Sequence, residues 1–235
     1  MLRIEDIDGP RSRPHLSDEI RRDLEWLGLE WDEVPAQSTR LASYLAAAET
    51  LRNNGLLYPC TCTRKQIVEA GAQTGSDGLI YPGTCKSKPR DPALPAAWRL
   101  DTAKAEALTG ELFWHDEFKG VQKVDLSDLG DVALVRKDLP ASYHLAVTLD
   151  DAADGVTLVT RGADLFCATH VHRTLQALLG LPVPRWHHHK LLKDETGEKL
   201  AKRRGSPALS GRRSAGEDGR MLADGLRKAH FQLGT

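Results

Sequence analysis

YHLAVTLDDAADGVTLVTRGADL, residues 143–165, contains two apolar runs separated by a polar turn. The sequence predicts a β-strand for each run, YHLAVTL and GVTLV, because short apolar segments bounded by turn residues are typical of strands. The second run ends at Arg161, followed by Gly-Ala-Asp and then a helical pattern. In an open α/β sheet, ligands bind at the carboxyl ends of the strands. The stretch therefore predicts an α/β fold with Arg161 at a ligand-binding edge.

Arg161 has two interpretations at this position. A guanidinium can bind a small anion such as a carboxylate through two parallel hydrogen bonds, and Gly162 lets the backbone turn sharply away from the strand. Alternatively, Arg161 is a solvated side chain on a surface turn. This stretch alone does not decide between the two.

The composition is that of an ordinary globular protein. Of the 235 residues, 40% are hydrophobic and 28% charged, which suits one domain with an insertion or two small domains. The net charge of -1 gives no overall attraction to nucleic acid, so such a partner needs a local basic patch. The sequence shows no membrane-spanning run and no signal peptide, so we expect a cytoplasmic protein without a membrane partner.

The first residues, Met1 to Ile4, have the pattern of a buried strand that begins without a turn or cap, and we expect further sequence before it. The run leads into three carboxylates: Glu5, Asp6 and Asp8. Carboxylates at a strand end can bind a metal, a base or an ammonium group, but the same residues are common in turns.

Amphipathic helices are predicted along the chain as scaffold. The first has Ser17 as its N-cap and ends at Gly28, and a later one spans Thr169 to Leu179 with Gly180 as its C-cap. Thr63 to Gln66 fits a capping box at the start of another helix. A further helix begins near Ser38 and directs five residues into the core: Leu41, Tyr44, Leu45, Ala48 and Leu51. Between Ala97 and Val135 the sequence predicts strands separated by polar turns.

Three cysteines are close in the sequence. Cys60 and Cys62 are one residue apart, and a glycine-rich loop brings back Cys85. Thiolates bind zinc tetrahedrally, so these residues supply three ligands, with Tyr81 or water as the fourth. Three thiols without a metal are the alternative. Cys167 is predicted to be a buried thiol on a distant helix.

Two polar stretches follow. Residues 187–189 are three histidines in a predicted strand, and because neighbouring side chains alternate between faces, they cannot all meet one metal ion. Contact with phosphate or nucleotide is the other interpretation. Residues 199–213 contain six basic residues and no acid. Lysines in such a loop can hold nucleotide phosphates, although a basic run more often only solvates a surface.

Five motifs together resemble the catalytic domain of glutamyl-tRNA synthetases: LRIEDID at 2–8, CTC with a later YPGTC, SYHLAVTLDD at 142–151, GVTLVTRGADL at 155–165 and KLAKR at 199–203. KLAKR is similar to the KMSKS signature of class I aminoacyl-tRNA synthetases. The resemblance is greatest to the shortened glutamyl-Q tRNA(Asp) synthetase family, which lacks the anticodon-binding domain. It implies a Rossmann-like catalytic domain at 1–55 and 141–235, N-terminally incomplete, with a zinc-binding acceptor-type subdomain inserted at 56–140.

The resemblance also implies a function and residue roles. The family activates L-glutamate with ATP, independently of tRNA, and transfers the glutamyl group to queuosine in the anticodon of tRNA(Asp). Glu5, Tyr143 and Arg161 would bind glutamate. Lys202, assisted by Lys199, would contact the ATP phosphates, with Mg²⁺ expected. Structural zinc would be bound by the set Cys60, Cys62, Tyr81 and Cys85. We expect a monomeric ligase.

The chain departs from the family pattern in two places. Ala201 replaces the serine of KMSKS, which removes one hydroxyl but keeps both lysines. The HIGH motif that precedes the first strand in the family is not found, and its loss is expected to reduce glutamate activation severely. Three other readings remain: a fragment of a glutamyl-tRNA synthetase, a non-catalytic zinc-bearing RNA-binding module, and a truncated product that folds poorly.

Overall fold

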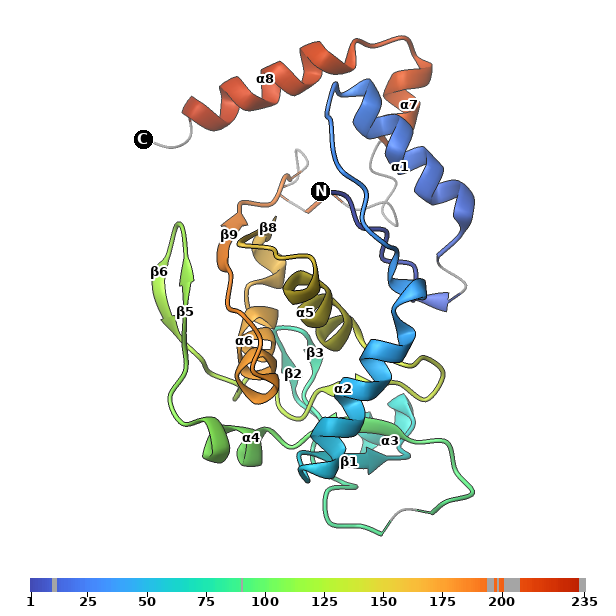
Figure 1. The fold of residues 1–235 in the computed structure, drawn as a ribbon, viewed down its shortest axis with the longest axis vertical. Coiled ribbons are helices and arrows are strands. Elements are labelled where there is room, and N and C mark those ends of the chain that lie inside the picture. Colours follow the sequence, from blue (N-terminus) through green and yellow to red (C-terminus); the bar gives the residue numbers. More distant parts are fainter. Residues whose placement is uncertain (10–11, 90, 194–196, 198, 201–207, 233–235) are drawn as a thin grey trace. The chain divides into compact units, whose positions relative to one another are not determined.

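The structure, a computed structural model, describes residues 1–9, 12–89, 91–193, 197, 199–200 and 208–232, with only the backbone considered at 229–232. The chain divides into two compact units, coloured by sequence in Figure 1. Unit 1 consists of Met1–Ser38 and Leu192–Thr235, and unit 2 of Thr39–Leu191. Each unit is described by itself. Among the residues described, no helix combines the length and the apolar character needed to cross a bilayer.

Unit 1 is built from helices and extended chain. Its helices are α1 (Pro14–Trp26), α7 (Leu209–Ser214) and α8 (Gly219–Gln232), and the short 3-10 helix η2 (Gln37–Thr39) lies at its boundary. The prediction that Ser17 is an N-cap is wrong, because α1 already begins at Pro14 with Arg13 as N-cap. Proline suits the first helical position for two reasons. Its ring fixes φ near the helical value, and a residue at this position has no intrahelical acceptor for the N–H that proline lacks.

The strand predicted at Met1 to Ile4 is not formed as such. Leu2 makes an isolated parallel bridge with Glu33, in which the Leu2 N–H donates to Asp32 O at 2.8 Å and the Val34 N–H donates to Leu2 O at 3.0 Å. Both Leu2 and Ile4 are only half-buried. The apolar residues therefore lie in an extended segment that forms a single β-bridge and not a complete β-strand.

Unit 2 contains the sheets. A four-stranded sheet has the order β6-β5-β9-β8, in which β5, β9 and β8 are parallel and β6 is antiparallel to β5. A three-stranded antiparallel sheet has the order β1-β4-β7, and β2 and β3 form a hairpin. The strand bounds are β1 (Leu57–Cys60), β2 (Thr74–Gly75), β3 (Gly78–Leu79), β4 (Ala97–Leu100), β5 (Phe113–Asp116), β6 (Gly120–Lys123), β7 (Ala133–Val135), β8 (Leu158–Gly162) and β9 (Arg185–His189). The helices of unit 2 are α2 (Leu41–Asn53), α3 (Arg64–Glu69), α4 (Thr102–Thr109), α5 (Tyr143–Ala153), η3 (Ala163–Leu165) and α6 (Ala168–Leu179).

The first half of the stretch 143–165 is a helix. The strand predicted for YHLAVTL is wrong, because α5 runs from Tyr143 to Ala153. It packs against α2, α6 and β7, so apolar residues surround the helix and hide the helical period. A short apolar run cannot be assigned by periodicity alone. Six of its residues are buried: His144, Leu145, Ala146, Val147, Thr148 and Asp150.

The second half of that stretch contains a strand, as predicted, but the strand begins at Leu158 and not at Gly155. β8 ends with Arg161 and Gly162, and it pairs in parallel with β9, with Arg161 opposite His188. The helix α6 joins the two strands and buries Val171 and Leu175 completely. Gly180 ends α6 in the left-handed conformation at φ 64°, as the sequence predicts. The carboxyl end of β8 therefore carries Arg161 at the sheet edge where ligands bind in α/β folds.

Other local predictions have mixed outcomes. The capping box is confirmed, since Thr63 caps α3 and Gln66 bonds back to it. On α2, the five residues expected in the core do not all reach it, because Leu45 is 52% exposed. The helix α4 and the strand β6 lie where only turns were expected between predicted strands. Asp101 starts α4 by accepting a hydrogen bond from the Lys104 N–H.

Candidate functional site

Arg161 is held by hydrogen bonds on three sides of its guanidinium. Its Nε donates to His188 Nε2 at 3.1 Å, and its Nη2 donates to Thr169 Oγ1. Its Nη1 donates to Tyr143 Oη at 3.3 Å. Tyr143 is the first residue of α5 and is 37% exposed, so this side of the group faces outward. Arg161 is thus an ordered side chain, and the interpretation as a solvated arginine is wrong.

A line of hydrogen bonds leads from Arg161 to the β2–β3 hairpin. Arg161 Nη1 lies 3.2 Å from His172 Nδ1, and His172 Nε2 lies 3.2 Å from His144 Nδ1. His144 Nε2 lies 3.2 Å from Asp77 Oδ2, in the turn between β2 and β3. His144 and Asp77 also line a pocket of about 170 Å³. The three side chains link α6, α5 and the hairpin through one polar path.

Asp116 supports the arginine from the opposite side. Its Oδ2 lies 2.6 Å from His188 Nδ1, and neither side chain is exposed. Its Oδ1 accepts hydrogen bonds from the backbone N–H groups of Phe118 and Lys119, both at 3.0 Å. The carboxylate is therefore held by the turn after β5 and orients the imidazole on β9.

The burial of these groups fixes their charge. Burial lowers the pKa of His172 well below its usual value, and the Arg161 guanidinium beside it acts in the same direction. Burial also lowers the pKa of His188, although Asp116 opposes the shift. Burial acts to raise the pKa of Asp116, but hydrogen bonds from His188 and from the backbone outweigh it and the pKa is lowered. At neutral pH both imidazoles are neutral and Asp116 is ionised.

The structure brings Tyr143 and Arg161 together, as expected for two of the predicted glutamate-binding residues. The third, Glu5, lies in unit 1, where its Oε1 is 3.5 Å from Arg3 Nη2. Asp6 has a local role in the same unit, since it accepts hydrogen bonds from the backbone N–H of Ser38 at 2.8 Å and from its hydroxyl at 2.6 Å. Of the acids at 5–8, Asp6 therefore connects this segment to Ser38 of η2.

Sequence reasoning missed the partners of Arg161. The alternation of residues 187–189 is confirmed, since His188 is buried and its neighbours are half-buried. His188 contacts Asp116 and Arg161 and is not at the surface, which fits a positioning group better than a phosphate contact. A signal was present in α6, where His170 and His172 are both buried polar residues. Buried imidazoles require hydrogen-bond partners, and the sequence alone does not say which.

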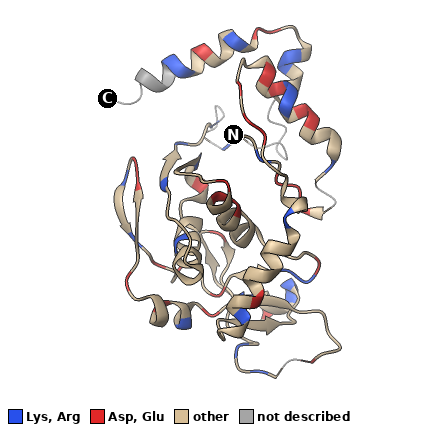
Figure 2. Ribbon diagram, viewed as in Figure 1, with Lys and Arg blue, Asp and Glu red and all other residues tan. Residues whose placement is uncertain are grey.

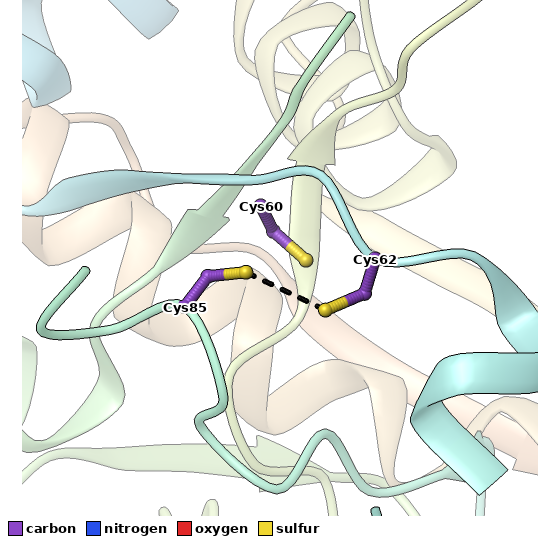
Figure 3. A group of neighbouring side chains, drawn as sticks. All are labelled: Cys60, Cys62 and Cys85. Carbon is purple, nitrogen blue, oxygen red and sulfur yellow. Dashed lines mark hydrogen bonds between the residues drawn. The ribbon is translucent and has the colours of Figure 1, made fainter. Parts of the chain in front are cut away.

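Three cysteine side chains point toward one another near the end of β1 (Figure 3). The Sγ atoms of Cys60, Cys62 and Cys85 all lie within 4.8 Å of one another, and those of Cys62 and Cys85 are 3.4 Å apart. A tetrahedral zinc with Zn–S bonds of about 2.3 Å requires S–S distances of about 3.8 Å. Tyr81 Oη lies 3.5 Å from Cys62 Sγ. The four groups therefore have a spacing and a donor chemistry that fit zinc.

The pKa values of the groups in this cluster shift in opposite directions: that of Cys85 is lowered, and those of Cys62 and Tyr81 are raised. Burial acts to raise the pKa of Cys85, but hydrogen bonds from Tyr81 and from the backbone of Thr61 outweigh it and lower the pKa to about 6. Burial raises the pKa of Cys62. The thiolate is the form that binds metal. Cys167 is outside the cluster, as predicted, but it is only partly buried, so the prediction of a buried thiol there is wrong.

The basic stretch at 199–213 is described in part. Lys202 and its neighbours at 201–207 lie outside the described residues, and Lys199 forms an antiparallel bridge with Lys193. Arg212 pairs with Glu217 at 2.7 Å, and Arg213 with Asp23 at 3.2 Å. Figure 2 shows acidic residues interspersed with basic ones on α1, where Asp23 lies. These two arginines therefore have acidic partners in unit 1.

Comparisons with known proteins give a consistent result. Residues 1–229 match the family model for the catalytic domain of tRNA synthetases class I (E and Q). The chain is 47% identical to a glutamyl-Q tRNA(Asp) synthetase of Rhodobacter capsulatus, over 92% of this chain and 83% of the relative. It is 45% identical to a glutamyl-Q tRNA(Asp) synthetase of Deinococcus radiodurans, over 95% of this chain and 75% of the relative.

Solved structures agree with the fold. The chain is similar to a glutamate tRNA ligase from Elizabethkingia meningosepticum in complex with its amino acid, with a TM-score of 0.68 and 25% identity. The match covers 87% of this chain and 45% of that chain, so this chain spans a little under half the length of the solved protein. A glutamate-tRNA synthetase from Elizabethkingia anophelis has a TM-score of 0.69 at the same identity.

Proposed function

The chain belongs to the class I tRNA synthetases of the glutamate and glutamine type and is an enzyme of the ligase class, and on that premise we propose that it activates glutamate with ATP and transfers the glutamyl group to queuosine in tRNA(Asp). The observation that carries the proposal is the 47% identity to a glutamyl-Q tRNA(Asp) synthetase over most of both chains. In the first step, a glutamate carboxylate oxygen attacks the α-phosphorus of ATP and pyrophosphate leaves. In the second, a hydroxyl of queuosine attacks the acyl carbon and AMP leaves.

The glutamate site is assigned to three residues. Arg161 holds its guanidinium at the carboxyl end of β8, where its positive charge suits a carboxylate. Tyr143 lies beside it at 3.3 Å and supplies a neighbouring hydroxyl. Glu5 would bind the ammonium group by opposite charge. These groups bind and orient the substrate, so the acceleration comes from positioning and charge stabilisation, with no covalent enzyme intermediate.

The ATP site is assigned to the lysines of the KLAKR segment. Lys202 would contact the phosphates, with Lys199 assisting, as negative charge develops during nucleotidyl transfer. Mg²⁺ would accompany ATP as the usual counter-ion of its phosphates. Both lysines are retained in the segment although Ala201 lacks the hydroxyl of serine.

A structural zinc is assigned to the thiol cluster. Cys60, Cys62 and Cys85 would supply three thiolates, and Tyr81 the fourth group. Bound zinc would tie the end of β1 to the loop before β4. This would stiffen the subdomain proposed at 56–140, between the two catalytic segments proposed at 1–55 and 141–235.

Two assays test the proposed function. Glutamate-dependent exchange between ATP and pyrophosphate is expected without tRNA, and labelled glutamate is expected to transfer to tRNA(Asp) that contains queuosine. The same tRNA with guanine at the wobble position is the control, and tRNA(Glu) tests the alternative acceptor. Transfer to tRNA(Glu) alone would overturn the choice of acceptor. RNA binding without either reaction would support the non-catalytic RNA-binding module instead.

A matched pair of variants tests the role of Arg161. The substitution Arg161→Lys keeps the charge but removes the planar guanidinium that His188 and Thr169 hold in place, and we expect glutamate binding to weaken by about 100-fold or more, since the cation is no longer oriented. Arg185→Lys is the control, because Arg185 is exposed on the neighbouring strand and pairs with Glu117. Equal glutamate affinity in the two variants would contradict the assignment of Arg161.

A further inference from the structure

Six side chains of unit 2 form one continuous line of hydrogen bonds with Arg161 inside it. The line begins and ends at a carboxylate, and its donor–acceptor distances are 2.6–3.2 Å. In order, its members are Asp116, His188, Arg161, His172, His144 and Asp77. Because carboxylates only accept and guanidinium only donates, the position of every imidazole proton along the line is determined.

Between Asp116 and Arg161, one placement of the imidazole proton is consistent with the hydrogen bonds. Ionised Asp116 accepts at Oδ2, so His188 carries its proton on Nδ1. The lone pair of His188 is then on Nε2, where it accepts from Arg161 Nε at 3.1 Å. Thr169 strengthens this arrangement, because it accepts from Arg161 Nη2 and its hydroxyl is 3.2 Å from the same imidazole nitrogen.

Between Arg161 and Asp77, the positions of the imidazole protons follow from the guanidinium, which only donates. Arg161 Nη1 donates, so His172 presents the lone pair of Nδ1 and carries its proton on Nε2. That proton is donated to His144 Nδ1 at 3.2 Å. His144 then carries its own proton on Nε2 and donates it to Asp77 Oδ2. Each of the three imidazoles therefore uses one nitrogen as donor and the other as acceptor.

We propose that this line is a positioning device for the amino-acid carboxylate: His188 and His172, both neutral, hold the guanidinium of Arg161, while Asp116 and Asp77 set their tautomers. The inference rests on the proposed function of Arg161 in binding glutamate. Neither histidine is a catalytic residue, since each acts through Arg161. The benefit is pre-organisation, because a guanidinium already locked in its bound orientation loses less side-chain freedom when the carboxylate arrives.

The same geometry makes the site sensitive to acid. A proton on His172 or His188 would turn an acceptor for Arg161 into a donor and place a second positive charge beside the guanidinium. Charged or titratable groups face both rings. His188 is faced by Asp116, Arg161, Lys119 and His170, and His172 by Arg161, His144 and His188. Because the pKa values of both rings are lowered, glutamate affinity should be constant at neutral pH and decline only in acid.

A set of three variants tests the device through glutamate and ATP dissociation constants measured by calorimetry. His172→Phe keeps the ring volume but removes the acceptor, and we expect the glutamate Kd to rise by about tenfold or more, since a hydrogen bond to a charged group is lost. His172→Asn retains an acceptor near the Nδ1 position and should restore affinity to within about threefold, with a shallower decline in acid. The ATP Kd should stay within about twofold in both variants.

His170→Phe is the matched control. His170 is buried on the same helix, and its Nδ1 accepts from the Asp125 N–H at 3.1 Å, so its own ring nitrogen is used outside the line of six side chains. Its substitution by phenylalanine is expected to affect stability but not the glutamate Kd. Equal effects of His170→Phe and His172→Phe on glutamate affinity would overturn the proposal, because they would indicate general loss of packing.

A measurement on the unaltered protein tests the tautomers directly. Ring ¹⁵N chemical shifts should show the proton of His188 on Nδ1 and that of His172 on Nε2. The opposite tautomer in either ring would overturn the proposal whatever the variants do. If Arg161→Lys leaves glutamate affinity unchanged, the proposed function of Arg161 fails. If Arg161→Lys abolishes binding while His172→Phe does not alter it, only the positioning device fails.

Discussion

Substitution of Asp131 by asparagine is expected to destabilise unit 2 strongly. Asp131 is only 6% exposed, and its two oxygens accept four hydrogen bonds. Oδ2 accepts from Tyr58 Oη at 2.7 Å and from Lys86 Nζ at 3.0 Å. Oδ1 accepts from the N–H and the hydroxyl of Thr102, at 3.0 and 2.7 Å. The carboxylate therefore ties β1 to the start of α4 and to the segment that follows Cys85.

The size of the destabilisation depends on how many of the four hydrogen bonds the asparagine amide can still form. The single oxygen of asparagine can stay with Thr102, which leaves its NH₂ group facing Lys86 and Tyr58. Each lost hydrogen bond to a charged group costs about 1.5–3 kcal/mol. The loss is partly offset, because Lys86 keeps Asp101 at 2.8 Å and the Tyr58 hydroxyl can turn to accept from the amide. We expect the free energy of unfolding to fall by about 2–3 kcal/mol.

The effect should depend on pH in a defined direction. Burial acts to raise the pKa of Asp131, but hydrogen bonds from Tyr58, Thr102 and Lys86 outweigh it and the pKa is lowered. A carboxylate with a lowered folded-state pKa contributes stability above its unfolded value of about 3.9 and loses it as the pH falls through the folded value. The difference between wild type and Asp131→Asn should be constant from about pH 8 to 5 and shrink below about pH 4.

Urea unfolding followed by circular dichroism measures both quantities. Asp128→Asn is the matched control, because Asp128 is exposed and accepts from the Ser76 N–H, and its cost should be within about 0.5 kcal/mol. The reasoning is refuted if Asp131→Asn also lies within about 0.5 kcal/mol of wild type at pH 7. A difference between the two proteins that grows below pH 4 would contradict the pKa argument.

Three further substitutions test the metal site and the core. The Cys85→Ser protein should lose zinc on dialysis, whereas the Cys167→Ser protein should keep it. Mass spectrometry of the metal measures both, and equal zinc content in the two variants would refute the proposed zinc site. Tyr44→Phe removes the hydroxyl that lies 2.8 and 2.9 Å from the two carboxylate oxygens of Asp150. The free energy of unfolding in urea should fall by about 1.5–3 kcal/mol, and an unchanged midpoint would show that this hydrogen bond contributes little. Leu145→Ala opens a cavity at a residue with no exposure on α5 and should cost about 2–5 kcal/mol, so an unchanged melting temperature would contradict the packing.

Features that depend on near neighbours could be predicted from the sequence. The capping box at Thr63–Gln66 closes within four residues, and the glycine C-cap at Gly180 needs only its own backbone freedom. The carboxyl end of β8 is marked by Arg161-Gly162, because an apolar run stops there and a helix follows. The order of motifs along the chain also indicates the family. These are local patterns, and local chemistry suffices to form them.

The sequence by itself did not determine the helix α5 or the partners of Arg161. α5 is surrounded by packed elements, so its residues are buried on several faces and the period that distinguishes helix from strand is lost. The contacts that orient Arg161 join residues far apart, since His144 and Asp77 are 67 positions apart and His188 and Asp116 are 72 apart. The parallel pairing of β9 with both β8 and β5 and the packing of α5 against α6 bring these groups within hydrogen-bond distance. The residue types were readable in the chain, but their pairing is a property of the tertiary structure, because burial leaves each polar group only the partners that the packing supplies.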